Sequence, residues 1–89
     1  MNLAPGQSLR VGSEIKASGL QRLTNAYVEV DYGNGQVVRS GRVSLSPGQS
    51  ATLETFYTNR SLNVMIISEA TVRVRDGNGR ILDQRIERL

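Results

Sequence analysis

The chain has 89 residues, which is enough for one small domain and too few for two separate hydrophobic cores. Its net charge of +3 comes from ten arginines and a single lysine, Lys16, against eight acidic residues. There is no cysteine and no histidine. This excludes disulfide bonds and removes the side chains used by the common zinc sites and by most nucleophile–base pairs.

Four aromatic residues are present in the chain, so the core must consist mainly of valine, isoleucine and leucine. A thin core in so small a domain supplies little net stability, and we expect association with other chains to add to it. We further expect no catalytic residue, no metal, no cofactor and no small-molecule substrate. Protein partners, in a homo-oligomer or a larger assembly, are the expected ones.

The sequence shows no signal peptide and no apolar run of the roughly 18 residues or more that a membrane helix needs. Localisation therefore stays open. We expect a virion or the cytoplasm if the chain is full length, and an extracellular location if it is a domain of a longer protein.

Strand patterns dominate the first half of the chain. A Pro5-Gly6 turn precedes a short strand over 8–11, which could continue to Ile15. In the segment 27–32, alternate residues are apolar, as in a strand with one buried face. Asn34-Gly35 favours a tight hairpin turn. The returning segment 36–45 loses its alternation at Ser40-Gly41, which predicts a glycine bulge.

The second half repeats this order. Pro47-Gly48 precedes an alternating strand over 51–57, and the pattern of 72–75 places Val72 and Val74 on the buried face. Asn78-Gly79 predicts another hairpin turn, followed by a returning strand over 80–89. The segment 62–67 (LNVMII) is the most apolar of the chain, and we predict a strand covered on both faces there.

These signals predict an all-β protein: one immunoglobulin-like, antiparallel β-sandwich of about seven or eight short strands that spans residues 1–89. The sequence PGQS occurs at 5–8 and again at 47–50, and AYVEVDYGNG at 26–35 matches ATVRVRDGNG at 70–79. We interpret segments 5–45 and 47–89 as two similar β units related by an approximate two-fold axis. The alternative is convergence, since Pro-Gly and Asn-Gly are common in turns.

Two motifs have a chemical interpretation beside a structural one. Glu29 and Asp31 share one face of a strand and could bind a cation, but arginines on neighbouring strands could neutralise them. These arginines are Arg39, Arg42, Arg73 and Arg75. The Gly-Asn-Gly segments resemble phosphate-binding loops, but each lies between two strands instead of opening a helix, so we interpret both as hairpin turns.

The segment 40–58, SGRVSLSPGQSATLETFYT, resembles bacterial immunoglobulin-like β-sandwich modules of the CARDB and FxLYD kind. The opening segment 4–9, APGQSL, resembles the first strand of the same modules. The chain lacks the buried tryptophan and the cysteine pair of antibody-type domains. The resemblance implies a non-catalytic adhesive, spacer or docking module, and it assigns no ligand-binding residues.

We therefore predict a non-enzymatic structural or interaction protein, a small subunit of a larger assembly such as a viral capsid decoration or another particle component. One alternative is a bacterial cell-surface or secreted adhesion or spacer module. Another is a basic barrel that binds single-stranded nucleic acid through arginine contacts and through stacking on Tyr27 and Tyr57.

The expected contact surface combines the outward side of the hairpins with the last strand. Apolar residues on both faces of that strand suggest pairing with a partner, whereas its charges are equally typical of an edge that avoids pairing. The predicted contact residues are Tyr27, Arg73, Arg75, Arg85, Arg88 and Leu89.

Overall fold

The computed structural model describes all residues from Met1 to Leu89 and confirms an all-β protein. Nine strands follow one another without a helix. Their bounds are β1 Asn2–Leu3, β2 Ser8–Lys16, β3 Leu23–Asp31, β4 Val37–Arg39, β5 Val43–Leu45, β6 Ser50–Thr58, β7 Met65–Ile66, β8 Glu69–Arg75 and β9 Ile81–Arg88.

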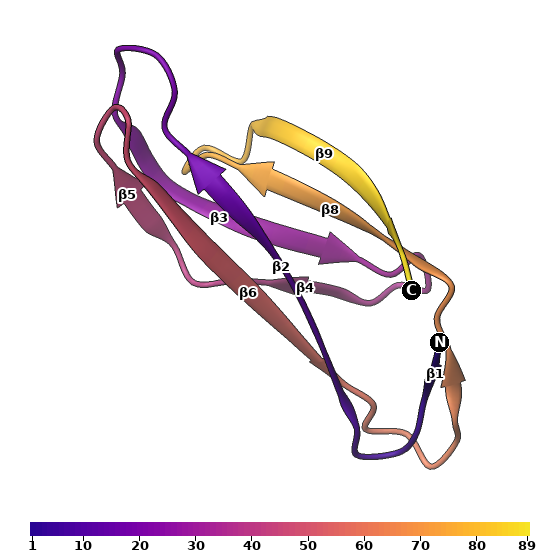
Figure 1. Ribbon diagram of the computed structural model, residues 1–89. Helices are drawn as coiled ribbons and strands as arrows, with labels where there is room; N and C mark the ends of the chain where they lie inside the picture. Colours follow the sequence, from indigo (N-terminus) through magenta and orange to yellow (C-terminus); the bar gives the residue numbers. More distant parts are fainter.

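The strands form two main layers in an elongated molecule of 48 × 19 × 19 Å (Figure 1). One layer is a ribbon of β2 and β6, paired antiparallel over nine residues. The other is a five-stranded sheet in the order β4-β3-β8-β9, in which β5 also pairs with β3. The short strands β1 and β7 pair with each other near the chain ends. This is a sandwich-like arrangement.

The hydrophobic core lies between these layers. From the ribbon it takes Leu9, Val11 and Ile15, which alternate with exposed residues along β2. From the sheet it takes alternate residues of β3 and β8: Ala26, Val28, Val30, Ala70, Val72 and Val74. Only 19 of the 89 residues are buried, so the core is as thin as the composition predicts.

The two PGQS segments form the same turn at opposite ends of the ribbon. Gly6 and Gly48 both have positive φ, at 81° and 85°, which glycine adopts readily. The side-chain oxygen of Gln7 accepts the N–H of Ala4 at 2.7 Å, and that of Gln49 accepts the N–H of Ser46 at 2.9 Å. One turn therefore starts β2 and the other starts β6.

Each of the two long ladders has a pair of equivalent residues at its midpoint. In the ribbon, Gly12 lies opposite Glu54, its counterpart 42 positions later. In the sheet, Glu29 lies opposite Arg73, its counterpart 44 positions later. An antiparallel ladder whose midpoint joins equivalent residues is symmetric about that midpoint. This geometry is what two similar β units related by a two-fold axis produce.

The sequence prediction was wrong for the segment 62–67. Only Met65–Ile66 is a strand, β7, and Leu62 is 94% exposed and Ile66 78% exposed. Leu3 on β1, by contrast, is only 1% exposed and lies in the core opposite Met65. The loop 59–64 instead lies at one end of the ribbon, beyond the last residue of β6. Its apolar side chains, Leu62 and Val64, are exposed to solvent.

The turn at Asn34-Gly35 also differs from the prediction. The two residues with positive φ are Gly33 (78°) and Gly35 (82°), and Asn34 acts through its side chain, whose Oδ1 accepts the N–H of Gln36 at 3.1 Å. The glycine bulge predicted at Ser40-Gly41 is instead a break between two strands, because β4 ends at Arg39 and β5 begins at Val43.

Candidate interaction surface

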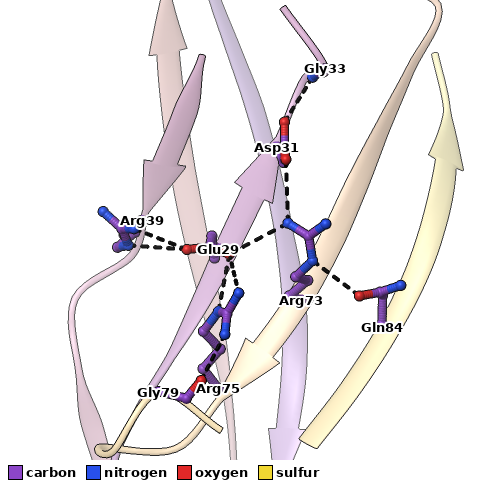
Figure 2. Close-up of polar contacts among 8 residues, drawn as sticks. All are labelled: Glu29, Asp31, Gly33, Arg39, Arg73, Arg75, Gly79 and Gln84. Atoms are coloured by element: carbon purple, nitrogen blue, oxygen red, sulfur yellow. Dashed lines mark hydrogen bonds and ion pairs between the residues drawn. The ribbon is translucent and has the colours of Figure 1, made fainter. Parts of the chain in front are cut away.

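The outer face of the five-stranded sheet carries a network of ion pairs around Glu29 (Figure 2). The Glu29 side chain is only 6% exposed, because it projects from the central strand β3 with arginines on both sides. Its Oε1 lies 3.1 Å from Arg39 Nη2 on β4, and its Oε2 lies 3.0 Å from Arg75 Nη2 on β8. Arg73 Nη1 lies farther away, 3.5 Å from Oε2.

Asp31 extends this network towards the hairpin turn. The N–H of Gly33 donates to Asp31 Oδ1 at 2.8 Å and lowers the pKa of the carboxyl group, against the opposing effect of burial. Arg73 lowers the pKa of Asp31 further, since its Nη1 lies 3.4 Å from Oδ2. Arg73 also donates from Nε to Gln84 Oε1 at 3.0 Å, which joins β3, β8 and β9 across the face (Figure 2).

Tyr27, the aromatic residue predicted for the contact surface, is only 8% exposed. The guanidinium of Arg42 lies over its ring, 4.4 Å from the centroid, as in a cation–π contact. Tyr57, the other tyrosine considered for stacking on bases, is 9% exposed and lies in the core beside Tyr32, with ring centroids 5.1 Å apart. Neither ring is exposed enough to stack against a nucleic-acid base.

The predicted contact residues of the hairpin face therefore have intramolecular partners. The side chains of Arg73 and Arg75 are each 23% exposed and pair with Glu29. Arg75 also donates to the backbone oxygen of Gly79 at 2.7 Å. A partner at this face would meet ion pairs that are already formed, and would gain little by competing for them.

The last strand, β9, is different because one of its sides has no strand beside it. It pairs only with β8 and forms the edge of the sheet (Figure 1). Arg88 is exposed and Leu89 is half-buried. Arg85 points towards the ribbon, where Nη1 donates to Ser13 Oγ and Nη2 to the backbone oxygen of Gly12, both at 2.8 Å.

Three apolar side chains of β9 are exposed to solvent. Ile86 is 63% exposed, Ile81 45% and Leu82 40%. The sequence contained this signal, because apolar residues occur on both faces of the last strand. The contact residues predicted for that strand were nevertheless Arg85, Arg88 and Leu89. Exposed isoleucine and leucine beside unpaired backbone groups are the features of a strand that can accept a partner.

The other half of the molecule holds an edge for comparison with β9. The strand equivalent to β9 is β4, which has only three residues; after the break at 40–42 it is followed by β5, the equivalent of β1. At the break, Ser40 N–H donates to Val28 O at 2.9 Å and Ser40 Oγ accepts the N–H of Val28 at 2.9 Å. Short, broken strands protect an edge from pairing. By contrast, β9 runs for eight residues, with one bulge near its start.

Comparisons with family models, curated proteins and solved structures found no match. The likeness to immunoglobulin-like modules therefore stays a prediction. None of the structural elements is a helix long and apolar enough to span a membrane.

Proposed function

We propose that this protein is a non-enzymatic structural subunit that associates with other protein chains through the open edge at β9. The proposal rests on one observation: of the two equivalent edge strands, β4 has only three residues, whereas β9 runs for eight and carries exposed isoleucines. A long edge strand that exposes isoleucine side chains is a liability in a protein that remains a monomer. We infer that it is retained because it forms a contact.

The charged groups of the sheet face support a structural role rather than a catalytic one. Glu29 is held by three arginines, which keeps its carboxylate in an ion-paired, nearly buried position. A general acid or base must reach a substrate, and this carboxylate has no open path to one. The same ion pairs occupy Arg73 and Arg75, which a nucleic-acid surface would need free for phosphates.

Within this class, we favour a component of a repeating assembly, such as a particle or capsid decoration subunit, over an adhesion or spacer module. A repeating assembly requires contacts between copies, and the thin core adds a reason for them, because burial of further apolar surface would stabilise the fold. A spacer module has no such need and would be a monomer.

The test is a sedimentation-velocity concentration series. We expect the weight-average mass to rise with concentration to a multiple of the 9.8 kDa chain. Ile86→Lys should weaken the association, because it replaces the most exposed apolar side chain of β9 with a charged one. Phe56→Lys is the matched control, since Phe56 is 62% exposed on β6, in the other layer, and should leave association unchanged. A mass that stays at one chain at every concentration would exclude the proposal.

A further inference from the structure

We propose that the partner at the open edge is a second copy of this chain, whose β9 pairs antiparallel with β9 about a two-fold axis at Ile86. This inference rests on the proposed function and specifies its partner and register. It follows from three properties of the strand: which backbone groups are free, where the strand is regular, and which registers place opposite charges together.

The free backbone groups are those of Gln84, Ile86 and Arg88. The N–H of Leu89 donates to Ser68 O at 3.0 Å, so Leu89 directs its backbone groups towards β8. In an antiparallel ladder this direction alternates from residue to residue. The even-numbered residues from Gln84 to Arg88 therefore point their N–H and C=O groups to the open side, and only a register that joins even with even residues can form hydrogen bonds.

The regular part of the edge starts after Leu82. Asp83 pairs with Val74 and Ile81 with Arg75, so Leu82 is the extra residue of a β-bulge. A bulge disrupts the ladder where it occurs. A second β9 would therefore pair best with the stretch 83–89, whose central residue is Ile86. This register places Ile86 opposite Ile86 of the second copy and removes from water the most exposed apolar side chain of β9.

The charges of the strand support the same register. With the axis at Ile86, Arg85 of each copy lies opposite Glu87 of the other. Arg85 Nε and Glu87 Oε2 are already 3.0 Å apart within one chain, so the four side chains would form a closed ring of alternating charge. Shifting the axis by one position to Arg85 would place Arg85 opposite Arg85, which is destabilising. An axis at Gln84 would place Asp83 opposite Arg85 of the other copy. It would also place the bulged Leu82 opposite Ile86, where the ladder is disrupted.

In the dimer the two five-stranded sheets would join edge to edge into one continuous sheet, with both β2–β6 ribbons on the same side. The contact of Arg85 with Gly12 and Ser13 is compatible with this arrangement, because it lies between β9 and the ribbon of its own chain. That contact also holds the Arg85 side chain in place before the second copy arrives.

Single cysteines test the register, because the chain has no cysteine of its own. Under mild oxidation, Ile86→Cys should give a disulfide-linked dimer, since directly opposite residues have Cα atoms at about 5.5 Å. Gln84→Cys alone should not form a link, but a mixture of Gln84→Cys and Arg88→Cys chains should form the mixed dimer. A Gln84→Cys homodimer, or no link at Ile86→Cys, would overturn the proposal.

Charge variants give an independent test in sedimentation. Glu87→Arg alone should weaken association at least tenfold, because like charges then face each other across the contact. Arg85→Glu alone should do the same, and an equimolar mixture of the two variants should restore the dimer. Circular dichroism of each variant checks that it is folded.

The outcomes separate this inference from the proposed function. Association that is insensitive to both charge variants and gives no link at Ile86→Cys would leave a structural subunit with a different contact. A wild-type chain that stays a monomer would exclude both.

Discussion

Glu29 and Arg73 lie directly opposite each other in the β3–β8 ladder, and their side chains form an ion pair with 3.5 Å between Nη1 and Oε2. The two residues also occupy equivalent places in the two halves of the chain, where AYVEV matches ATVRV. The midpoint of the β3–β8 ladder is thus a pair of opposite charges. One half supplies the carboxylate and the other supplies the guanidinium.

The first prediction concerns this carboxylate. Glu29→Gln should lower the free energy of unfolding by about 1–3 kcal/mol, because three arginines then face a neutral group in a nearly buried position. Urea denaturation measures the change. Glu54→Gln is the control: it removes a pair with Arg10 at 3.6 Å in which both side chains are well exposed, and should change stability by less than about 1 kcal/mol. Equal effects of the two substitutions would contradict the importance of the network.

The second prediction follows from the two-fold arrangement of the ends. The N-terminal ammonium group of Met1 donates to Ile67 O at 2.9 Å and lies 3.5 Å from Leu89 O. The strand β1 therefore begins close to the end of β9, just as β5 comes after β4 along the other edge of the sheet. A circular permutant with a short linker between Leu89 and Met1, opened between Gly41 and Arg42, should therefore fold to the same structure. Thermal melting and amide NMR spectra test it.

An opening between Glu54 and Thr55 is the matched control for the permutant, since it cuts β6 in the middle of its ladder with β2. That chain should not fold. Failure of the first permutant under conditions in which the linear chain folds would show that the two halves are not equivalent at this position.

The third prediction concerns Asn59, which is fully buried and organises the loop after β6. Its Nδ2 donates to Leu3 O at 2.9 Å and to Asn63 O at 2.8 Å, while Oδ1 accepts the N–H of Ser61 at 2.9 Å. Asn59→Ala should cost about 2–4 kcal/mol in thermal or chemical unfolding, because the buried backbone oxygen of Leu3 and the partly buried backbone groups of Ser61 and Asn63 lose their partner. Asn63→Ala, at an exposed side chain, should be nearly neutral. A neutral Asn59→Ala would show that the loop does not depend on the side chain.

The fourth prediction is a pH dependence from Asp31. The N–H of Gly33 and the guanidinium of Arg73 hold the pKa of this carboxyl group below its ordinary value. The folded state therefore favours the ionised form, and the contribution to stability is present above the ordinary pKa and lost as the pH falls through the folded value. In Asp31→Asn, stability should fall less steeply on acidification than in the wild type. Parallel curves of unfolding free energy against pH would refute the assignment.

Local patterns along the chain determined most of the strands. The alternation over 51–57 reflects one buried and one more exposed face of β6. Residues 27–31 lie in β3 as predicted, but both faces are covered there, because Tyr27 and Glu29 are buried as well as Val28 and Val30. The PGQS turns are local as well, because glycine supplies the positive φ and the following glutamine closes the turn through its own side chain. These features depend on neighbours in sequence, so a single sequence reveals them.

Long-range pairing decided the rest. The pattern of segment 62–67 could not show that β1 and β7 pair away from the centre of the sandwich and leave Leu62 in solvent. The sequence patterns of the other strands could not show that the charges of β3, β4 and β8 pair with one another around Glu29. They also could not show that β9 lies at the edge of the sheet. Hydrophobicity and turn chemistry are properties of single residues and short segments. Which strand lies at an edge depends on contacts between residues more than forty positions apart, and only the tertiary structure contains them.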